Sequence, residues 1–244
     1  MAWKSLSLHF KQTYEGGYRY LDKCGEFMLA ATDRMRFITS EATPTGAKME
    51  IPEQGVHAGC DSLSLSVAQE LPVDDGTYFL DLCKGLVELV MSHFDPKSVL
   101  RNGFLWKSYT PYTNPSDMLA ASLKHGGAFH EELAKAVGMV PENKNLDYFF
   151  VSGSKDLHVV LQPVTFERLN LPRRNVDARA TKDQKSRVDR FNEFAERVGD
   201  TLSHGLVLDV DLMENDPPKA SSLDKHFEEL RQKTNLIRKL FQTR

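Results

Sequence analysis

The chain has 244 residues, of which 41% are hydrophobic and 27% are charged, and its formal net charge is −3. This composition excludes a disordered chain, and the lack of any apolar run near ~20 residues excludes a membrane-spanning helix. The first ten residues lack the apolar stretch of a secretory leader, and the three cysteines have no CxxC spacing. We therefore expect an ordered, cytoplasmic protein with reduced thiols and no membrane contact.

Hydrophobic periodicity in the first half predicts alternating strands and helices. Strands follow from strict alternation of apolar and polar residues, and helices from apolar residues at three- and four-residue steps. In chain order, we expect a strand at 3–10, a helix at 18–37, a strand at 61–69, a helix at 78–94 and an extended segment at 99–112. A stretch punctuated by proline and glycine, 43–55, precedes the second strand.

The second half follows a similar order of elements without a residue-level repeat. It comprises helices at 116–123 and 130–139, a hairpin at 146–164 that turns at 152–154, a charged helix at 178–202, a strand at 205–213 and a terminal helix at 221–241. Together the halves indicate an α+β fold of two successive split βαβ-like units, with mainly antiparallel sheets and packed helices. We expect the units to span 1–113 and 114–244, as two domains or within one compact domain.

The terminal amphipathic helix is the best-specified element of the sequence. Ser221 and Asp224 match the capping box S-x-x-[DE], and an apolar stripe follows at helical spacing. The stripe comprises Leu223, Phe227, Leu230, Thr234, Ile237 and Phe241. Packing on the chain's own sheet would cover this stripe. The alternative is a protein partner that contacts Phe227, Leu230, Ile237 and Phe241.

Two aspartates, Asp209 and Asp211, lie one residue apart in the apolar segment HGLVLDVDLMENDPP. The period of a strand puts both carboxylates on one face, opposite Leu206, Leu208, Val210 and Leu212. At ~7 Å apart along a strand, the two carboxylates would share a divalent cation if a third ligand approached. A half-buried strand whose polar face meets water or a basic helix would show the same alternation. The metal site is therefore one of two interpretations.

A basic segment at 168–197 holds nine Lys and Arg against five Asp and Glu. It would suit contact with nucleic acid or another anion, with an affinity that falls as salt rises. The contacting side chains would be Arg173, Arg174, Arg179, Lys182, Arg187 and Arg190. The interleaved acidic residues favour instead a solvated helix with internal ion pairs.

Other motifs that carry chemistry are missing from the sequence. It contains no GxxxxGK[ST] or GxGxxG phosphate loop and no Gly-x-Ser-x-Gly elbow, and its eight histidines do not fall at metal-ligand spacing. We therefore predict no cofactor apart from the divalent metal of the interpretation above, and the sequence identifies no catalytic residue.

Several segments carry a resemblance to known proteins. They are a first strand followed by a helix, the helix GTYFLDLCKGLVELVMSHF leading into a strand like LRNGFLWKSY, and LVLDVDLME followed by SLDKHFEELRQKTNLIRKLF. On these segments the chain resembles a sporadically distributed family of uncharacterised bacterial proteins of about this length. The likeness covers most of the chain, and its motifs are structural. It implies the fold, and it implies no activity and no catalytic residue.

These observations lead to three hypotheses about function. The leading one is a cytoplasmic bacterial binding or accessory protein without catalysis, which acts through contacts with a protein partner or a second copy. The first alternative is a metal-dependent enzyme of phosphoryl or nucleotidyl transfer that uses Asp209 and Asp211. The second is nucleic-acid binding through residues 173–190.

Overall fold

The strands of the described residues form one antiparallel sheet. The computed structural model describes residues 3–72, 75–112, 146–165, 204–218 and 222–240, with the single positions 117, 185, 189 and 192. Nine strands occur within these ranges, in the order β2-β3-β4-β5-β1-β6-β9-β8-β7, and each neighbouring pair is antiparallel. No helix in the same ranges is both long and apolar enough to cross a membrane.

The strands differ in length, and the longest lie in the centre of the sheet. Their bounds are β1 Lys4–Glu15, β2 Ile38–Thr43, β3 Gly46–Ile51, β4 Val56–Cys60, β5 Ser64–Glu70, β6 Ser98–Tyr112, β7 Leu146–Ser152, β8 Lys155–Thr165 and β9 His204–Asn215. The helices are α1 Tyr20–Met35, α2 Thr77–His93 and α7 Leu223–Leu240, with a 3-10 turn, η1, at Pro52–Gln54. The α+β class, the mainly antiparallel strands and the C-terminal helix are thus confirmed.

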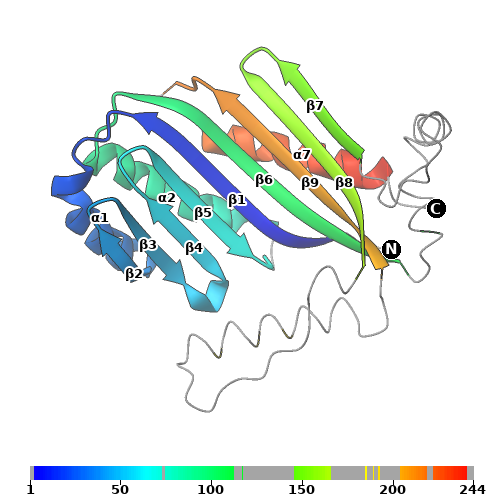
Figure 1. Ribbon diagram of the computed structural model, residues 1–244, viewed down its shortest axis with the longest axis horizontal. Coiled ribbons are helices and arrows are strands. Elements are labelled where there is room, and N and C mark those ends of the chain that lie inside the picture. The colour runs from blue at the N-terminus through cyan, green and yellow to red at the C-terminus, as the bar shows by residue number, and fades with distance from the viewer. Residues whose placement is uncertain are drawn as a thin grey trace, which may run out of the picture.

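The three described helices lie on one face of the sheet (Figure 1). The core lies between them and this face of the strands. There Phe227 of α7 stacks on Trp106 of β6, with ring centroids 5.9 Å apart, and meets Phe104 edge-on at 5.3 Å. We call the opposite face, which no described helix covers, the open face.

The terminal helix α7 packs as its apolar stripe predicts. Leu223, Phe227, Leu230 and Thr234 are buried, and Ile237 packs against the core. The stripe is covered by the chain's own sheet and by α2, and Phe241 lies outside the described residues. The helix begins one residue later than the capping box suggests, since the backbone N–H of Lys225 donates to Ser222 Oγ at 3.4 Å. Ser221 also lies outside the described residues.

The sequence does not predict three short strands, β2, β3 and β4. The stretch 43–55 contains β3 and η1, and β2 and β4 flank it. The side chains of β2 are exposed with one exception, Thr43, so no alternation marks that strand. The predicted strand at 61–69 begins later, at Ser64, because Asp61 Oδ1 accepts from the backbone N–H groups of Leu63 and Ser64, both at 2.7 Å, and forms a turn.

The hairpin predicted at 146–164 is confirmed as β7 and β8. Ser152 pairs with Lys155, and Gly153 between them has a φ of +63°, which a two-residue hairpin turn requires and glycine adopts without strain. The helices expected at 116–123, 130–139 and 178–202 lie outside the described residues. The division at residue 113 stays a prediction. Strands from both segments share the sheet, since β6 pairs with β9.

Candidate functional site

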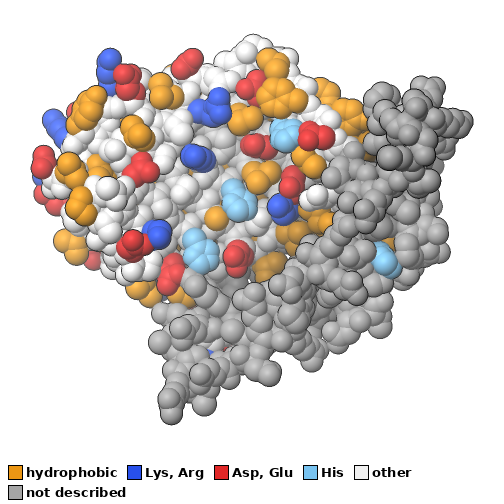
Figure 2. Space-filling view, in the orientation of Figure 1, with side chains coloured by type: hydrophobic (Ala, Val, Ile, Leu, Met, Phe, Trp, Pro, Cys, Tyr) orange, Lys and Arg blue, Asp and Glu red, His pale blue; other side chains and the backbone are white. Residues whose placement is uncertain are grey.

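The two faces of β9 carry the side chains that the alternation predicts. Leu206, Leu208, Val210 and Leu212 are at most 1% exposed and face the helices. Asp209 and Asp211 lie on the open face, half-buried. Figure 2 views this face and shows acidic, basic and histidine side chains over the central strands. The neighbours of the two aspartates therefore come from strands that the sequence could not place.

Asp209 has a cation as its nearest partner. Lys107 Nζ of β6 lies 3.4 Å from Asp209 Oδ2, while Oδ1 is buried and has no hydrogen-bond partner among the described residues. Burial raises the pKa of Asp209, and Lys107 counteracts part of this rise. The carboxylate thus belongs to a half-buried ion pair on the sheet surface.

Asp211 lies opposite His158 of β8 in the strand register. Burial raises its pKa as well, against the influence of His158 and Arg101. His158 Nε2 is in turn 2.7 Å from Asp147 Oδ1 of β7. A row of ionic side chains therefore runs from β7 across β8 and β9 to β6.

A serine and histidine pair that the sequence did not predict lies close to this row. His9 Nε2 of β1 is 2.9 Å from Ser7 Oγ. Burial lowers the pKa of His9, and Lys107 lowers it further. A nucleophile and base of this kind need a third group that orients the base. No described residue hydrogen-bonds the other ring nitrogen of His9.

The metal interpretation gains no further ligand in the described part of the chain. Within it, no three His, Cys, Asp or Glu side chains come close enough together to hold a metal ion. Asp209 and Asp211 would supply two carboxylate ligands and His158 an imidazole, but these groups do not converge on one point. The metal site stays a prediction.

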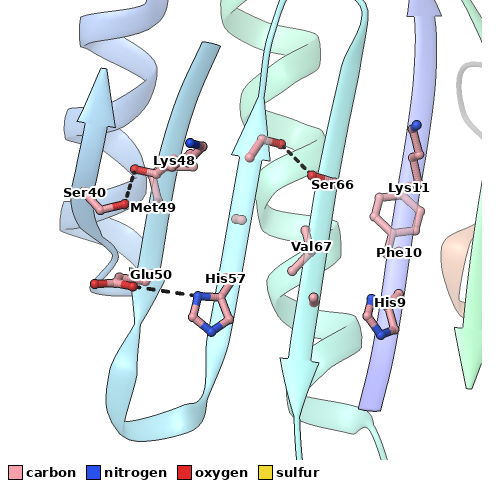
Figure 3. A pocket seen from close by; sticks show the side chains of 13 residues that line it. His9, Phe10, Lys11, Ser40, Lys48, Met49, Glu50, His57, Ser66 and Val67 are labelled. Carbon is pink, nitrogen blue, oxygen red and sulfur yellow. Dashed lines mark hydrogen bonds and ion pairs between the residues drawn. The ribbon is translucent and has the colours of Figure 1, made fainter. Parts of the chain in front are cut away.

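A hollow of about 630 Å³ lies on the open face over β1, β5, β4 and β3 (Figure 3). The surface is hollowed here because three of the lining residues, Gly59, Ser66 and Ala68, have a small side chain or none. Several of the polar groups around it are bonded within the chain. Ser66 Oγ donates to the Gly59 carbonyl at 3.3 Å, and His57 Nδ1 lies 3.7 Å from Glu50 Oε2. The hollow is thus a shallow, largely apolar depression with polar groups around it.

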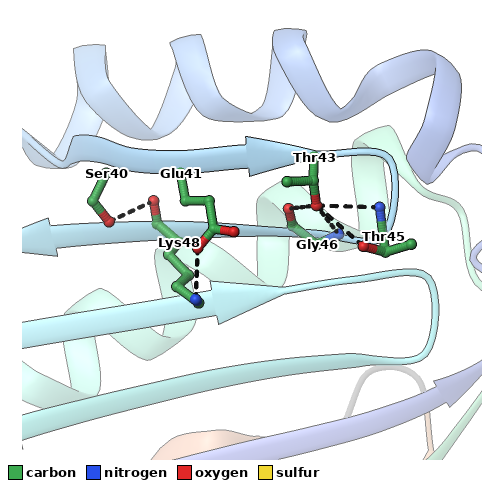
Figure 4. Close-up of polar contacts among 6 residues, drawn as sticks. All are labelled: Ser40, Glu41, Thr43, Thr45, Gly46 and Lys48. Carbon is green, nitrogen blue, oxygen red and sulfur yellow. Dashed lines mark hydrogen bonds and ion pairs between the residues drawn. The ribbon is translucent and has the colours of Figure 1, made fainter.

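One edge of the sheet, β2, is polar and irregular (Figure 4). Its register with β3 shifts between Thr39 and Glu41, and Lys48 Nζ lies 2.6 Å from Glu41 Oε2. Ser40 Oγ donates to the Lys48 carbonyl at 3.2 Å. Short length, a bulge and charged side chains are the features by which sheet edges avoid pairing with other chains.

The other edge, β7, has a different character. Four consecutive large hydrophobic residues are exposed there: Tyr148 by 43%, Phe149 by 58%, Phe150 by 52% and Val151 by 67%. The one charged residue of the strand, Asp147, is paired with His158. Figure 2 shows hydrophobic side chains along the upper right of the open face, where Figure 1 places β7. No described strand pairs with the outer side of β7.

The apolar surface of β7 continues on the helix side of the sheet. The rings of Tyr148 and Phe150 stack there, with centroids 6.1 Å apart. Next to them lies an apolar groove of about 320 Å³, lined by Leu146, Tyr148, Phe150, Leu157, Val159, Leu161, Ile237 and Leu240. Both faces of the β7 edge are therefore hydrophobic.

The remaining candidate residues fall into two groups. Phe227 and Leu230 are buried at 4% and 0% exposure, so their stripe faces the core, and Ile237 lines the groove beside β7. The basic residues of the predicted strip lie outside the described residues, as does Phe241. The strip comprises Arg173, Arg174, Arg179, Lys182, Arg187 and Arg190. Its contact with an anion stays a prediction.

No family model matches the chain, and no curated protein matches it. The resemblance to a sporadically distributed bacterial family stays a prediction. The function of this protein therefore has to be inferred from its own geometry.

Proposed function

We propose that this protein is a non-catalytic binding protein that acts through protein contacts, and that the β7 edge is its contact surface. The observation that carries the proposal is the run of four exposed hydrophobic residues, 148–151, on a sheet edge that no described strand pairs with. The partner would present an extended strand with apolar side chains.

The physical basis is the addition of a strand to a sheet. The outer side of an edge strand presents N–H and C=O groups in register, which form main-chain hydrogen bonds with an incoming strand. Side chains on both faces of β7 would then bury apolar surface against the same strand. A contiguous exposed apolar patch of this kind is typical of an interaction site.

The cellular setting belongs to the same proposal. The three cysteines, Cys24, Cys60 and Cys83, are free thiols in the structure. Burial raises the pKa of Cys60 to about 12 and that of Cys83 well above its ordinary value, so both stay protonated and unreactive. Such thiols suit the reducing bacterial cytoplasm, which we propose as the location.

Site-specific photo-crosslinking in cells tests the contact surface. A benzophenone amino acid placed at Phe149 should form a discrete adduct with one identified protein, mapped by mass spectrometry to an extended segment of that protein. The same group at Ile38, a 47% exposed residue of the β2 edge, is the matched control and should form none. Adducts of equal yield from both edges, or none from β7, would contradict the proposal.

The two alternatives from the sequence remain open to direct tests. Nucleic-acid binding through 173–190 predicts an affinity for DNA or RNA that falls steeply with salt and that changes when Arg173, Arg174 and Arg187 become Ala. Metal-dependent transfer predicts turnover of a nucleotide or sugar-nucleotide by the purified protein. Such turnover would also contradict a function without catalysis.

A further inference from the structure

We infer that the strand that pairs with β7 is β7 of a second copy of this chain, in antiparallel orientation about a two-fold axis that passes through Phe149. This inference rests on the proposed function and identifies its partner. The two sheets would then form one continuous sheet across both copies.

The length and sequence of β7 suit pairing with itself. The strand spans Leu146–Ser152, so Phe149 is its midpoint, and an axis there pairs every residue of the strand. Tyr148 then lies opposite Phe150 of the second copy, and Leu146 lies opposite Ser152. Full-length pairing in this register leaves no residue of β7 without a partner.

The aromatic side chains gain the most from this register. Tyr148 and Phe150 already stack on the helix side within one chain. Because Tyr148 of one copy would face Phe150 of the other across the axis, the row of rings would continue into the second copy. Aromatic residues directly opposite each other are favourable cross-strand pairs. The groove lined by Ile237 and Leu240 lies beside the same rings and extends the apolar contact.

The charges next to the edge do not oppose the pairing. Asp147, the one charged residue of β7, would face the uncharged Val151 of the second copy. Its carboxylate has His158 as a partner within its own chain, and Lys155 at the start of β8 binds Glu229 of α7. No like charges are therefore brought directly opposite each other, which would be destabilising.

The two edges of the sheet together favour a closed dimer. Pairing of β7 with β2 of another copy would be head-to-tail and would build rings or open-ended filaments of many copies. The register shift at Thr39/Glu41 and the Glu41–Lys48 ion pair disfavour pairing at β2. Pairing of β7 with β7 occupies the β7 edge of both copies, so assembly stops at two copies. A single strand pair is a small interface, so we expect a reversible dimer.

Sedimentation of the purified full-length protein over a micromolar concentration series tests the dimer. The average mass should rise with concentration from one chain toward two. Phe149→Lys, which places a charge on the axis opposite its own copy, should weaken association by about tenfold or more. Ile38→Lys is the matched control at the β2 edge and should leave association unchanged. Both variants should keep the circular dichroism spectrum of the wild type.

A disulfide scan tests the register and does not depend on the lysine variant. On a two-fold axis, residue 149 faces its own copy at the Cα separation of a direct antiparallel pair, ~4.5–5.5 Å, which lies within the Cα range of disulfides. In a Cys24→Ser background, mild oxidation should therefore link Phe149→Cys into a covalent dimer. Tyr148→Cys should link far less, because its own counterpart lies diagonally across the pair.

The outcomes separate this inference from the proposed function. A protein that keeps the mass of one chain at every concentration, with no covalent dimer from Phe149→Cys, would overturn the second copy as partner. Cross-links from Phe149 to a different protein would then still support a contact surface at β7. Association that survives Phe149→Lys, or equal linking of Phe149→Cys and Tyr148→Cys, would overturn the pairing inferred here.

Discussion

Asp209 and Asp211 are acidic groups in surroundings that disfavour their charged form. Their pKa values are raised, in each case chiefly by burial, so the folded chain binds protons at these positions more tightly than the unfolded chain does. The stability linked to them is fully present below their ordinary pKa of about 4 and is lost as pH rises through the raised values. At neutral pH the two carboxylates therefore reduce the stability of the fold.

Replacing both aspartates with asparagine tests this account. Asp209→Asn with Asp211→Asn should melt at the same temperature as the wild type or above it at pH 7, because the neutral amides remove the cost of the buried charges. The difference should vanish below about pH 4, where the wild-type carboxylates are protonated. Thermal melts at both pH values measure it.

The same two proteins decide the metal interpretation. A bound cation would raise the melting temperature of the wild type and not that of the double variant, since a ligand that binds the folded state stabilises it. On the proposed function we expect Mg²⁺ or Mn²⁺ to shift neither protein. A double variant that melts well below the wild type at pH 7 would contradict the electrostatic account.

At the scale of an element, the packing of α7 on the sheet depends on one aromatic side chain more than on the residues at the two ends of the helix. Phe227 is 4% exposed, stacks on Trp106 and contacts Phe79 and Phe104. Near the end of the helix, Arg238 lies over the same Trp106 ring, with its guanidinium carbon 5.0 Å from the ring centroid. These contacts attach the helix to β6, far from it in sequence.

Truncating this side chain should be costly. Phe227→Ala should lower the free energy of unfolding by about 3–5 kcal/mol, because it removes buried apolar surface and leaves a cavity in the core. Leu236→Ala on the same helix, where the side chain is 63% exposed, should change it by less than about 0.5 kcal/mol. Urea denaturation followed by circular dichroism measures both. Similar losses for the two variants would contradict the packing of α7.

For the whole molecule, the sheet connects the two segments on either side of residue 113. β6 pairs with β9 over twelve residue pairs, and α7 packs on both strands and on α2. Residues that a division at 113 would separate therefore share backbone hydrogen bonds and one core. This arrangement couples the folding of the described strands to one another.

We accordingly predict a single cooperative unfolding transition. Calorimetry should give a calorimetric enthalpy equal to the van't Hoff enthalpy, the signature of two-state unfolding. Leu86→Ala in α2 and Leu230→Ala in α7, both at fully buried positions, should shift the same transition. Two separate transitions, each sensitive to one of these changes, would show instead that 1–113 and 114–244 fold independently.

The sequence by itself determined the local features of this protein. The period of two in HGLVLDVDLM assigned the apolar residues of β9 to the core and its aspartates to the opposite face, and the stripe from Leu223 to Thr234 assigned the buried side of α7. Both predictions succeed because a strand or helix presents side chains at fixed intervals, so neighbouring residues record which side is buried. The side chains of β2 are exposed except for Thr43 and show no such alternation, so the sequence did not predict this strand.

Only the tertiary structure decided which strands are neighbours and which are edges. It placed Lys107 beside Asp209 and His158 opposite Asp211, and it left the hydrophobic residues of β7 at the margin of the sheet. Strand pairing is made by backbone N–H and C=O groups, which every residue except proline carries in the same form. Because those groups are alike at Lys107 and at Phe149, the order of the strands leaves no local mark in the sequence.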